Sequence, residues 1–340
     1  MSNPKALITG VTGMVGSHLT DYLLDNTDWE IYGLCRWNDN LENIEHLFSR
    51  INNKDRVQLV YGDLNDLVSL IEAMNISKPD YIFHLAAQSY PKTSFDSPLD
   101  TLNTNIIGTA KVLEAVKKTD CDPYIHVCAS SEVYGRVPKD KLPITEDVNF
   151  HPASPYAISK VGTDLIGRFY AEAYNMKIMT TRMFTHTGPR RGDVFAESTF
   201  AKQIAMIEAG LLPPVIKVGN LDSLRTWTDV RDAVKAYYML VTHNPIPGEY
   251  YNIGGTFSCT IKDMLLYLIS QSTRTDIAIE VDPDRLRPVD ADLQIPDTTK
   301  FTTHTGWKPE ITFEKTMNDL LSYWRKRVSP SQTGRKFLAR

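Results

Sequence analysis

The fold of this chain is decided by one stretch near its N-terminus, Ala6-Leu7-Ile8-Thr9-Gly10-Val11-Thr12-Gly13-Met14-Val15-Gly16. The apolar residues at its start predict a strand, and the pattern from His18 to Leu24 predicts a helix after it. The glycines between them lie where the strand turns into the helix, so a diphosphate can approach the backbone closely there. The stretch therefore predicts the first unit of a dinucleotide-binding domain.

A second motif, Tyr156-Ala157-Ile158-Ser159-Lys160, lies in the middle of the chain and follows Ser154-Pro155. A serine N-cap with proline at the first helical position predicts a helix start, which places Tyr156 in the first turn. Lys160 lies four residues on, on the same helix face. A phenol ionises near ~10, so the ammonium and the helix dipole are expected to favour the phenolate. The pair can also merely pack, but together with the glycines it predicts alcohol oxidation beside a nicotinamide.

Composition excludes several classes of protein. The chain has 340 residues and a formal charge of −4, with 42% apolar and 23% charged residues, so no basic surface favours nucleic acid. No apolar stretch approaches the roughly 18 residues of a membrane span. The four cysteines have no metal-ligand spacing, and the N-terminus has no signal-peptide pattern. We expect a cytoplasmic enzyme that binds neither a metal, a membrane nor nucleic acid.

The order of the expected elements predicts an α/β fold with a Rossmann-type, doubly wound parallel sheet and a smaller mixed α/β substrate-binding lobe. Expected strands are 6–9, 30–34, 57–61, 81–85, 124–128, 177–183 and 250–253, and expected helices are 16–24, 66–74, 99–118, 155–174 and 230–241. The predicted domains are 1–184 plus 227–256 for the dinucleotide and 185–226 plus 257–330 for the substrate, with 331–340 a tail.

Polar residues follow the strand at 124–128, in the segment Ser130-Ser131-Glu132-Val133-Tyr134-Gly135. The carboxyl ends of parallel strands are where such folds bind ligands, so these side chains are candidates for substrate contact. A hydroxyl can bond a reacting sugar oxygen, and a partly desolvated carboxylate can move a proton on carbon beside a carbonyl. Alternatively, the serines cap the strand and Glu132 is a solvated loop residue.

Together with Asp63-Leu64 and His84-Leu85-Ala86-Ala87-Gln88, these motifs resemble the extended short-chain dehydrogenase/reductases that act on nucleotide sugars. Within them the chain is most similar to GDP-mannose 4,6-dehydratase and relatives acting on GDP-heptoses. The further segments that support this resemblance are residues 188–192, 218–220 with Arg225, Arg287-Pro288 and 306–309. The resemblance covers residues 5–325.

The resemblance implies a role for each residue of the catalytic set. Tyr156 takes the proton of the sugar 4-hydroxyl while hydride passes from C4 to the cofactor, and Lys160 holds the nicotinamide ribose and lowers the pKa of the phenol. Ser130, which stands where dehydratases have threonine, bonds O4. Glu132 removes the C5 proton before water leaves C6, and hydride return to C6 gives the 4-keto-6-deoxy sugar.

The expected cofactor is NADP, because Arg36 stands where an NAD enzyme usually has an acid for the ribose, and a guanidinium suits a 2′-phosphate. Alternatively, Arg36 stacks on the adenine and NAD binds. Asp63 is expected to bond the adenine amino group, or else to cap a turn. The predicted cofactor contacts are Gly10, Thr12, Gly13, Met14, Val15, Gly16, Arg36, Asp63, Leu64, Leu85, Ala86, Ala87, Tyr156 and Lys160.

The predicted substrate is a GDP-sugar, either GDP-mannose or GDP-D-glycero-D-manno-heptose. Arginines would hold the nucleotide, and Thr185 departs from the family's asparagine, which allows a bulkier sugar. The predicted contacts are Gln88, Ser89, Ser131, Thr185, Arg190, Asn220, Arg225, Arg287 and Asp290. Residues 38–45 resemble a loop through which relatives form tetramers, so a homo-oligomer, a dimer or tetramer, is expected.

Two other functions remain open on the sequence. A 4-keto reductase, 4-epimerase or 4-dehydrogenase uses the same Tyr156 and Lys160, and some reductases have a glutamate at the position of Glu132. A non-catalytic dinucleotide sensor has no use for the Tyr, Lys, Ser and Glu set. The sequence therefore favours the 4,6-dehydratase.

Overall fold

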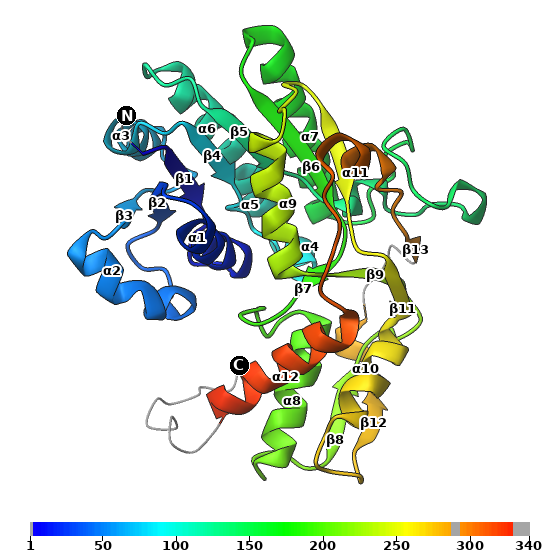
Figure 1. Cartoon of the computed structure of the whole chain (residues 1–340). Helices are drawn as coiled ribbons and strands as arrows, with labels where there is room; N and C mark the ends of the chain where they lie inside the picture. Colours follow the sequence, from blue (N-terminus) through cyan, green and yellow to red (C-terminus); the bar gives the residue numbers. More distant parts are fainter. Residues whose placement is uncertain (1–2, 287–292, 329–340) are drawn as a thin grey trace.

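A seven-stranded parallel sheet forms the centre of the protein (Figure 1). The structure is a computed structural model that describes residues 3–286 and 293–328. The strand order is β10-β6-β5-β4-β1-β2-β3, and every neighbouring pair is parallel. The strands are β1 Lys5–Thr9, β2 Glu30–Cys35, β3 Val57–Tyr61, β4 Tyr81–His84, β5 Tyr124–Cys128, β6 Ile178–Met183 and β10 Tyr250–Ile253.

Helices cover both faces of the sheet, which confirms the doubly wound fold. On one face α1 (Met14–Asn26) packs on α9 (Val230–Thr242), and on the other α3 (Leu67–Ser77) packs on α6 (Gly108–Lys117) beside α7 (Pro155–Tyr174). Parallel strands need such crossover helices, and the strands are apolar because both of their faces are buried.

Several helices differ from the sequence prediction. The single helix predicted over 99–118 is instead α5 (Pro98–Leu102), a π-helical turn Asn103–Ile107, and α6. The π turn contains Asn105, whose amide exchanges two hydrogen bonds with the backbone of Gln88, at 2.8 and 2.9 Å. The further helices α4 (Pro91–Asp96) and α2 (Phe48–Asn53), with the 3-10 helix Glu42–Leu47, were not predicted.

A smaller lobe has its own apolar core, formed by residues between Phe200 and Val328. Figure 1 shows its helices set apart from the large sheet. The lobe contains α8 Ala196–Glu208, α10 Ile261–Ser270 and α12 Phe313–Val328, with β8 Val215–Val218 paired to β12 Ala278–Val281. A second small sheet contains β9 Leu224–Asp229, β11 Phe257–Thr260, β13 Leu293–Gln294 and β7 His186–Thr187.

The two-domain division given by the sequence stays a prediction. The apolar cores show that the segment 257–330 contributes to both parts of the structure. Phe301, from α11 (Thr299–Thr305), and Trp307 belong to the core of the large sheet, although residues 257–330 were assigned to the lobe. The indole Nε1 of Trp307 donates to the carbonyl oxygen of Asp232 on α9 at 3.0 Å. The chain therefore returns to the sheet between α10 and α12.

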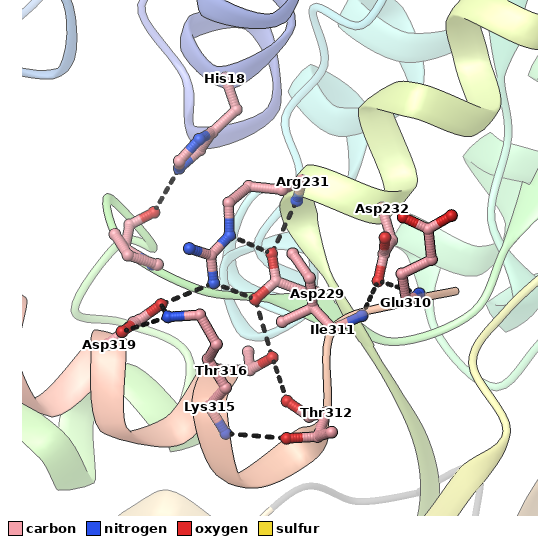
Figure 2. A network of polar contacts seen from close by, with 11 residues as sticks. His18, Asp229, Arg231, Asp232, Glu310, Ile311, Thr312, Lys315, Thr316 and Asp319 are labelled. Atoms are coloured by element: carbon pink, nitrogen blue, oxygen red, sulfur yellow. Dashed lines mark hydrogen bonds and ion pairs between the residues drawn. The ribbon is translucent and has the colours of Figure 1, made fainter. Parts of the chain in front are cut away.

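A partly buried polar network joins α12 to the end of β9 and the start of α9 (Figure 2). The Asp229 carboxylate, at the N-cap of α9, accepts hydrogen bonds from Arg231 and from the Thr316 hydroxyl, the latter at 2.7 Å. Arg231 also pairs with Asp319 of α12 at 2.7 Å. On α1, His18 lies 3.0 Å from the carbonyl oxygen of Pro189, so Nε2 donates to it. These contacts fix the lobe beside α1.

None of the helices within residues 3–286 and 293–328 is long and apolar enough to cross a membrane.

Candidate active site

One large cavity lies at the carboxyl ends of the central strands and extends to the lobe. Its volume is about 1030 Å³, above the roughly 300–1,000 Å³ usual for one ligand, so it has room for a cofactor and a substrate together. Every predicted site residue within the described part of the chain lines it, from Gly10 to Arg225. Arg287 and Asp290 lie outside the described residues. The ligand that each lining residue contacts stays a prediction.

The glycine-rich turn fits a dinucleotide diphosphate. Gly10 has φ +74°, and a Cβ there would lie 3.0 Å from the Cα of Ala86. A Cβ on Gly16 would lie 2.2 Å from the carbonyl oxygen of Gly10, so only glycine lets α1 start this close to β1. The N-cap of α1 is Gly13, which has no side chain to cover the first-turn N–H groups. These donors, at the positive end of the helix, suit a diphosphate.

The residues expected at the adenosine end lie in two turns. Asp63 does cap a turn, since its Oδ1 accepts the N–H of Asn65 at 2.8 Å, and it also lines the cavity. Arg36 lines the cavity as well, but its guanidinium is paired with Asp39, with Nη2 2.8 Å from Oδ1. Asp39 also lines the cavity and was not predicted as a site residue.

The catalytic helix starts as predicted. Ser154 accepts the N–H of Ala157 at 3.0 Å, Pro155 is the first helical residue, and Tyr156 follows in the first turn. The ammonium of Lys160 donates to the carbonyl oxygen of Cys128 at 2.8 Å, which fixes it at the end of β5. Both side chains are buried and line the cavity.

Burial dominates the electrostatics of this pair. Burial raises the pKa of the Tyr156 phenol above its ordinary value, although the hydrogen bond with Ser130 and the charge of Arg191 act in the opposite direction. Burial also lowers the pKa of Lys160. Desolvation therefore disfavours both charged forms, so a Tyr156 phenolate depends on nearby positive charge.

The segment after β5 presents Ser130, Ser131 and Glu132 to the cavity. Ser130 also caps the 3-10 helix Ser131–Tyr134, since its hydroxyl accepts the N–H of Glu132 at 3.2 Å. The sequence left capping and substrate contact as alternatives for Ser130. Its position allows both, because the capping hydroxyl also lines the cavity. Glu132 lines the same cavity as Tyr156 rather than lying on a solvated loop.

Buried polar groups bond Tyr134, the last residue of that 3-10 helix. The Tyr134 hydroxyl donates to Asn252 Oδ1 at 2.7 Å and accepts from Arg182 at 2.9 Å. Arg182 is in turn paired with Asp164 at 2.8 Å, and both charges are buried. The backbone that presents Glu132 is thereby fixed to β6 and α7.

Gln88 lines the cavity, but its side chain already has partners. Its amide bonds the backbone N–H and carbonyl of Tyr90, at 2.6 and 3.1 Å, and the hydroxyl of Thr101 at 3.1 Å. Gln88 therefore shapes the loop before α4, and its predicted substrate contact stays untested.

The arginine loop 188–192 contains one predicted residue and one that the sequence reasoning missed. Arg190, with φ +68°, pairs with Asp21 of α1 at 2.7 Å. Arg191 lies 3.4 Å over the ring of Phe195 and bonds Glu197 at 3.0 Å. Both arginines line the cavity, as do His186 and Lys92, which were also missed. Burial and the charge of Arg191 lower the pKa of His186 to about 4, so its ring is neutral.

Among the described residues, no group of three or more His, Cys, Asp or Glu side chains could hold a metal ion.

The parallel sheet, the glycine turn and the Tyr156–Lys160 pair in one cavity define an extended short-chain dehydrogenase/reductase. A family model described as GDP-mannose 4,6 dehydratase matches residues 7–320, and the chain belongs to this family. It is 31% identical to the GDP-mannose 4,6 dehydratase of Drosophila melanogaster, over 93% of this chain and 85% of the relative. It is 30% identical to the GDP-6-deoxy-D-mannose reductase of Pseudomonas aeruginosa, over 95% of this chain and 98% of the relative.

The solved structures include a similar protein with a bound dinucleotide. The structure of RMD from Pseudomonas aeruginosa, complexed with NADPH, superposes with a TM-score of 0.80 at 29% identity. The superposition covers 95% of this chain and 100% of the RMD chain. The resemblance inferred from the motifs is therefore confirmed for both the family and the fold.

Proposed function

We propose that this protein is an NADP-dependent GDP-sugar 4,6-dehydratase, a hydro-lyase that acts on GDP-mannose or GDP-D-glycero-D-manno-heptose. The observation that supports it best is that Tyr156, Lys160, Ser130 and Glu132 meet in the cavity that the glycine turn opens into. A simple reductase or dehydrogenase needs the first three residues. An enzyme that also eliminates water needs a further base, and Glu132 is a carboxylate within the same cavity.

Each catalytic residue has a task that its position allows. Bound NADP would accept hydride from C4 of the sugar and later return it to C6. Tyr156 accepts the proton of the 4-hydroxyl, and Ser130, which lines the same cavity, orients the same oxygen. Lys160 stabilises the phenolate form of Tyr156 that accepts this proton, since its ammonium is held one helical turn away.

The elimination follows from the C4 ketone. Glu132 removes the proton on C5, which the neighbouring carbonyl makes acidic, and passes it to the C6 hydroxyl, which leaves as water. Return of hydride to C6 would be matched by a solvent-exchangeable proton at C5, and Tyr156 holds the one that the 4-hydroxyl gave up. The sugar ends one water lighter, and the cofactor ends as it began.

The lobe supplies cations for the nucleotide. Arg190, Arg191 and Arg225 line the cavity, and guanidinium groups bind phosphates in a bidentate manner. We assign them to the diphosphate of the GDP-sugar, while Arg287 and Asp290, which lie outside the described residues, remain candidates from the sequence. Thr185 also lines the cavity, and it is smaller than the asparagine usual there, which favours a heptose.

The proposed enzyme is a cytoplasmic homo-oligomer, a dimer or tetramer. Three exposed apolar side chains of α7, Ile158, Leu165 and Phe169, lie on one face of the helix. Exposed apolar patches mark interaction sites, so we assign this face to a second copy of the chain. Light scattering is expected to show a dimer or tetramer, with dissociation on Phe169→Asp; a monomeric wild type would contradict the assignment.

The catalytic assignment is tested with two variants and matched controls. We expect Tyr156→Phe and Glu132→Gln to lose activity by roughly a hundredfold to ten-thousandfold, the usual contribution of one acid–base group. Tyr174→Phe and Glu172→Gln, both exposed positions of α7, serve as controls and should change little.

The Glu132→Gln variant separates the dehydratase from the alternatives. It should still transfer hydride from C4, seen as absorbance of the reduced nicotinamide, but release no water. Full dehydration by Glu132→Gln would remove the role assigned to that carboxylate. Since the chain is also similar to a reductase, reduction of a GDP-4-keto-6-deoxy sugar without any dehydration of GDP-sugars would establish the reductase instead.

A further inference from the structure

The turn that follows β2 holds a cation and an anion side by side. The backbone N–H of Asp39 donates to the carbonyl oxygen of Arg36 at 3.2 Å, and the N–H of Arg36 donates to Asp39 Oδ2 at 3.0 Å. The guanidinium Nε donates to Oδ1 at 2.9 Å, with Nη2 2.8 Å from the same oxygen. The carboxylate is therefore fixed beside the guanidinium by both backbone and side-chain contacts.

The two charges differ in how they meet solvent. The Arg36 side chain is 61% exposed, whereas that of Asp39 is only 15% exposed. Both residues line the cavity. They lie just beyond the carboxyl end of β2, where this fold places the ribose of the adenosine. Any dinucleotide bound here would meet both groups.

The pair has opposite effects on the two forms of the cofactor. A phosphate monoester has a charge of about −1.5 to −2, so a 2′-phosphate on Arg36 would be repelled by the adjacent carboxylate. One edge of the guanidinium is also already occupied by Asp39. The 2′-hydroxyl of NAD, by contrast, is a donor that a carboxylate accepts. Arg36 alone would select NADP, and Asp39 opposes that selection.

We infer that Asp39 helps to determine cofactor selectivity: it reduces the preference for NADP that Arg36 sets, so that NADP binds more tightly than NAD by no more than about tenfold. The inference rests on the proposed function, because it concerns the dinucleotide of the same site. It assigns Asp39 as a specificity-determining residue. A surface arginine that only stacks on the adenine would not need Asp39 beside it in the cavity.

The test measures dissociation constants of NADPH and NADH from nicotinamide fluorescence on the full-length protein freed of nucleotide. For the wild type the two constants should lie within about tenfold. Asp39→Asn keeps the acceptor for the Arg36 N–H but removes the charge, so NADPH should bind at least about tenfold tighter and NADH somewhat more weakly. Arg36→Gln should weaken NADPH and leave NADH bound.

A matched control is Asp276→Asn, because Asp276 pairs with Arg274 in a similar short turn at 2.6 Å but lies outside the cavity. It should change neither constant. If Asp39→Asn leaves the NADH-to-NADPH ratio unchanged, or weakens both equally, Asp39 is only a structural residue and the inference is wrong. If the wild type binds neither dinucleotide, the proposed function itself fails.

Discussion

The buried ion pair behind the catalytic segment allows a sharp prediction about stability. The Asp164 carboxylate accepts Arg182 Nε at 2.8 Å and Nη2 at 3.2 Å, and it also accepts Arg168 Nη1 at 3.2 Å. We consider Asp164→Ala, which removes these acceptors. Arg182 would keep its hydrogen bonds to Tyr134 and to the carbonyl of Glu146, but its charge would lose its counter-ion.

The magnitude follows from burial. The side chains of Arg182 and Asp164 are 1% and 0% exposed, so an unpaired guanidinium cannot regain water. Removing one partner of such a pair costs about 3–5 kcal/mol. The surface pair Arg50–Asp55 has the same 2.8 Å distance, but its side chains are 43% and 55% exposed. Asp55→Ala should therefore cost at most about 1 kcal/mol.

Urea unfolding followed by circular dichroism measures the difference. With slopes on the order of 3 kcal/mol per molar, Asp164→Ala should lower the midpoint by about 1 M or more, and Asp55→Ala by a few tenths of that. Equal shifts for the two variants would refute the argument, because burial is the main difference between the pairs. The same variant should lose dehydration more than dinucleotide binding, since Arg182 supports the segment that presents Glu132.

Three further predictions concern other parts of the structure. Gly16→Ala should abolish dinucleotide binding, measured by NADPH fluorescence, because its Cβ would lie 2.2 Å from the carbonyl oxygen of Gly10; binding within about twofold of wild type would contradict this. Burial lowers the pKa of His126 from 6.5 to about 3, so the unfolded chain binds a proton that the folded protein does not between these pH values. The free energy of unfolding should therefore fall as the pH drops from 6.5 toward 3. His126→Phe should flatten this fall in the urea midpoint, and an unchanged slope would show that other groups cause it. Asp229→Ala removes the N-cap of α9 and the acceptor of Thr316, while Arg231 keeps Asp319, so it should cost about 1–3 kcal/mol; a cost under about 0.5 kcal/mol would show that the network in Figure 2 contributes little.

Local signals were enough to predict most of the large sheet. The strands and the start of α7 depend on apolar runs and on Ser154-Pro155, which act over a few residues, and β3, β5 and β10 agree with the prediction at both ends. The π turn at Asn105 could not be predicted, because it depends on hydrogen bonds to Gln88, far away in the sequence. The return of Trp307 to the large sheet depends likewise on a distant partner, Asp232.

The site was predicted as far as motifs at strand ends could identify it. Glu132 lines the cavity because it follows β5 at the carboxyl ends of the parallel strands, and Tyr156 and Lys160 line it from the start of α7, where Lys160 bonds the end of β5. Arg191 was missed, although the adjacent arginine was chosen, since only the fold shows that both side chains line the cavity. Asp39 was missed because its importance depends on its contact with Arg36. The raised pKa of Tyr156 follows from burial, which no local motif specifies.

The central claim is that Tyr156 and Glu132 act on one sugar to remove water. Mass spectrometry of a GDP-mannose or GDP-heptose reaction in deuterated water tests it most directly. The account predicts a product lighter by one water, with one solvent deuterium held at C5, because Glu132 removes the original proton there. A sugar recovered without loss of water from every GDP-sugar tried, or a product that keeps its original hydrogen at C5, would contradict it.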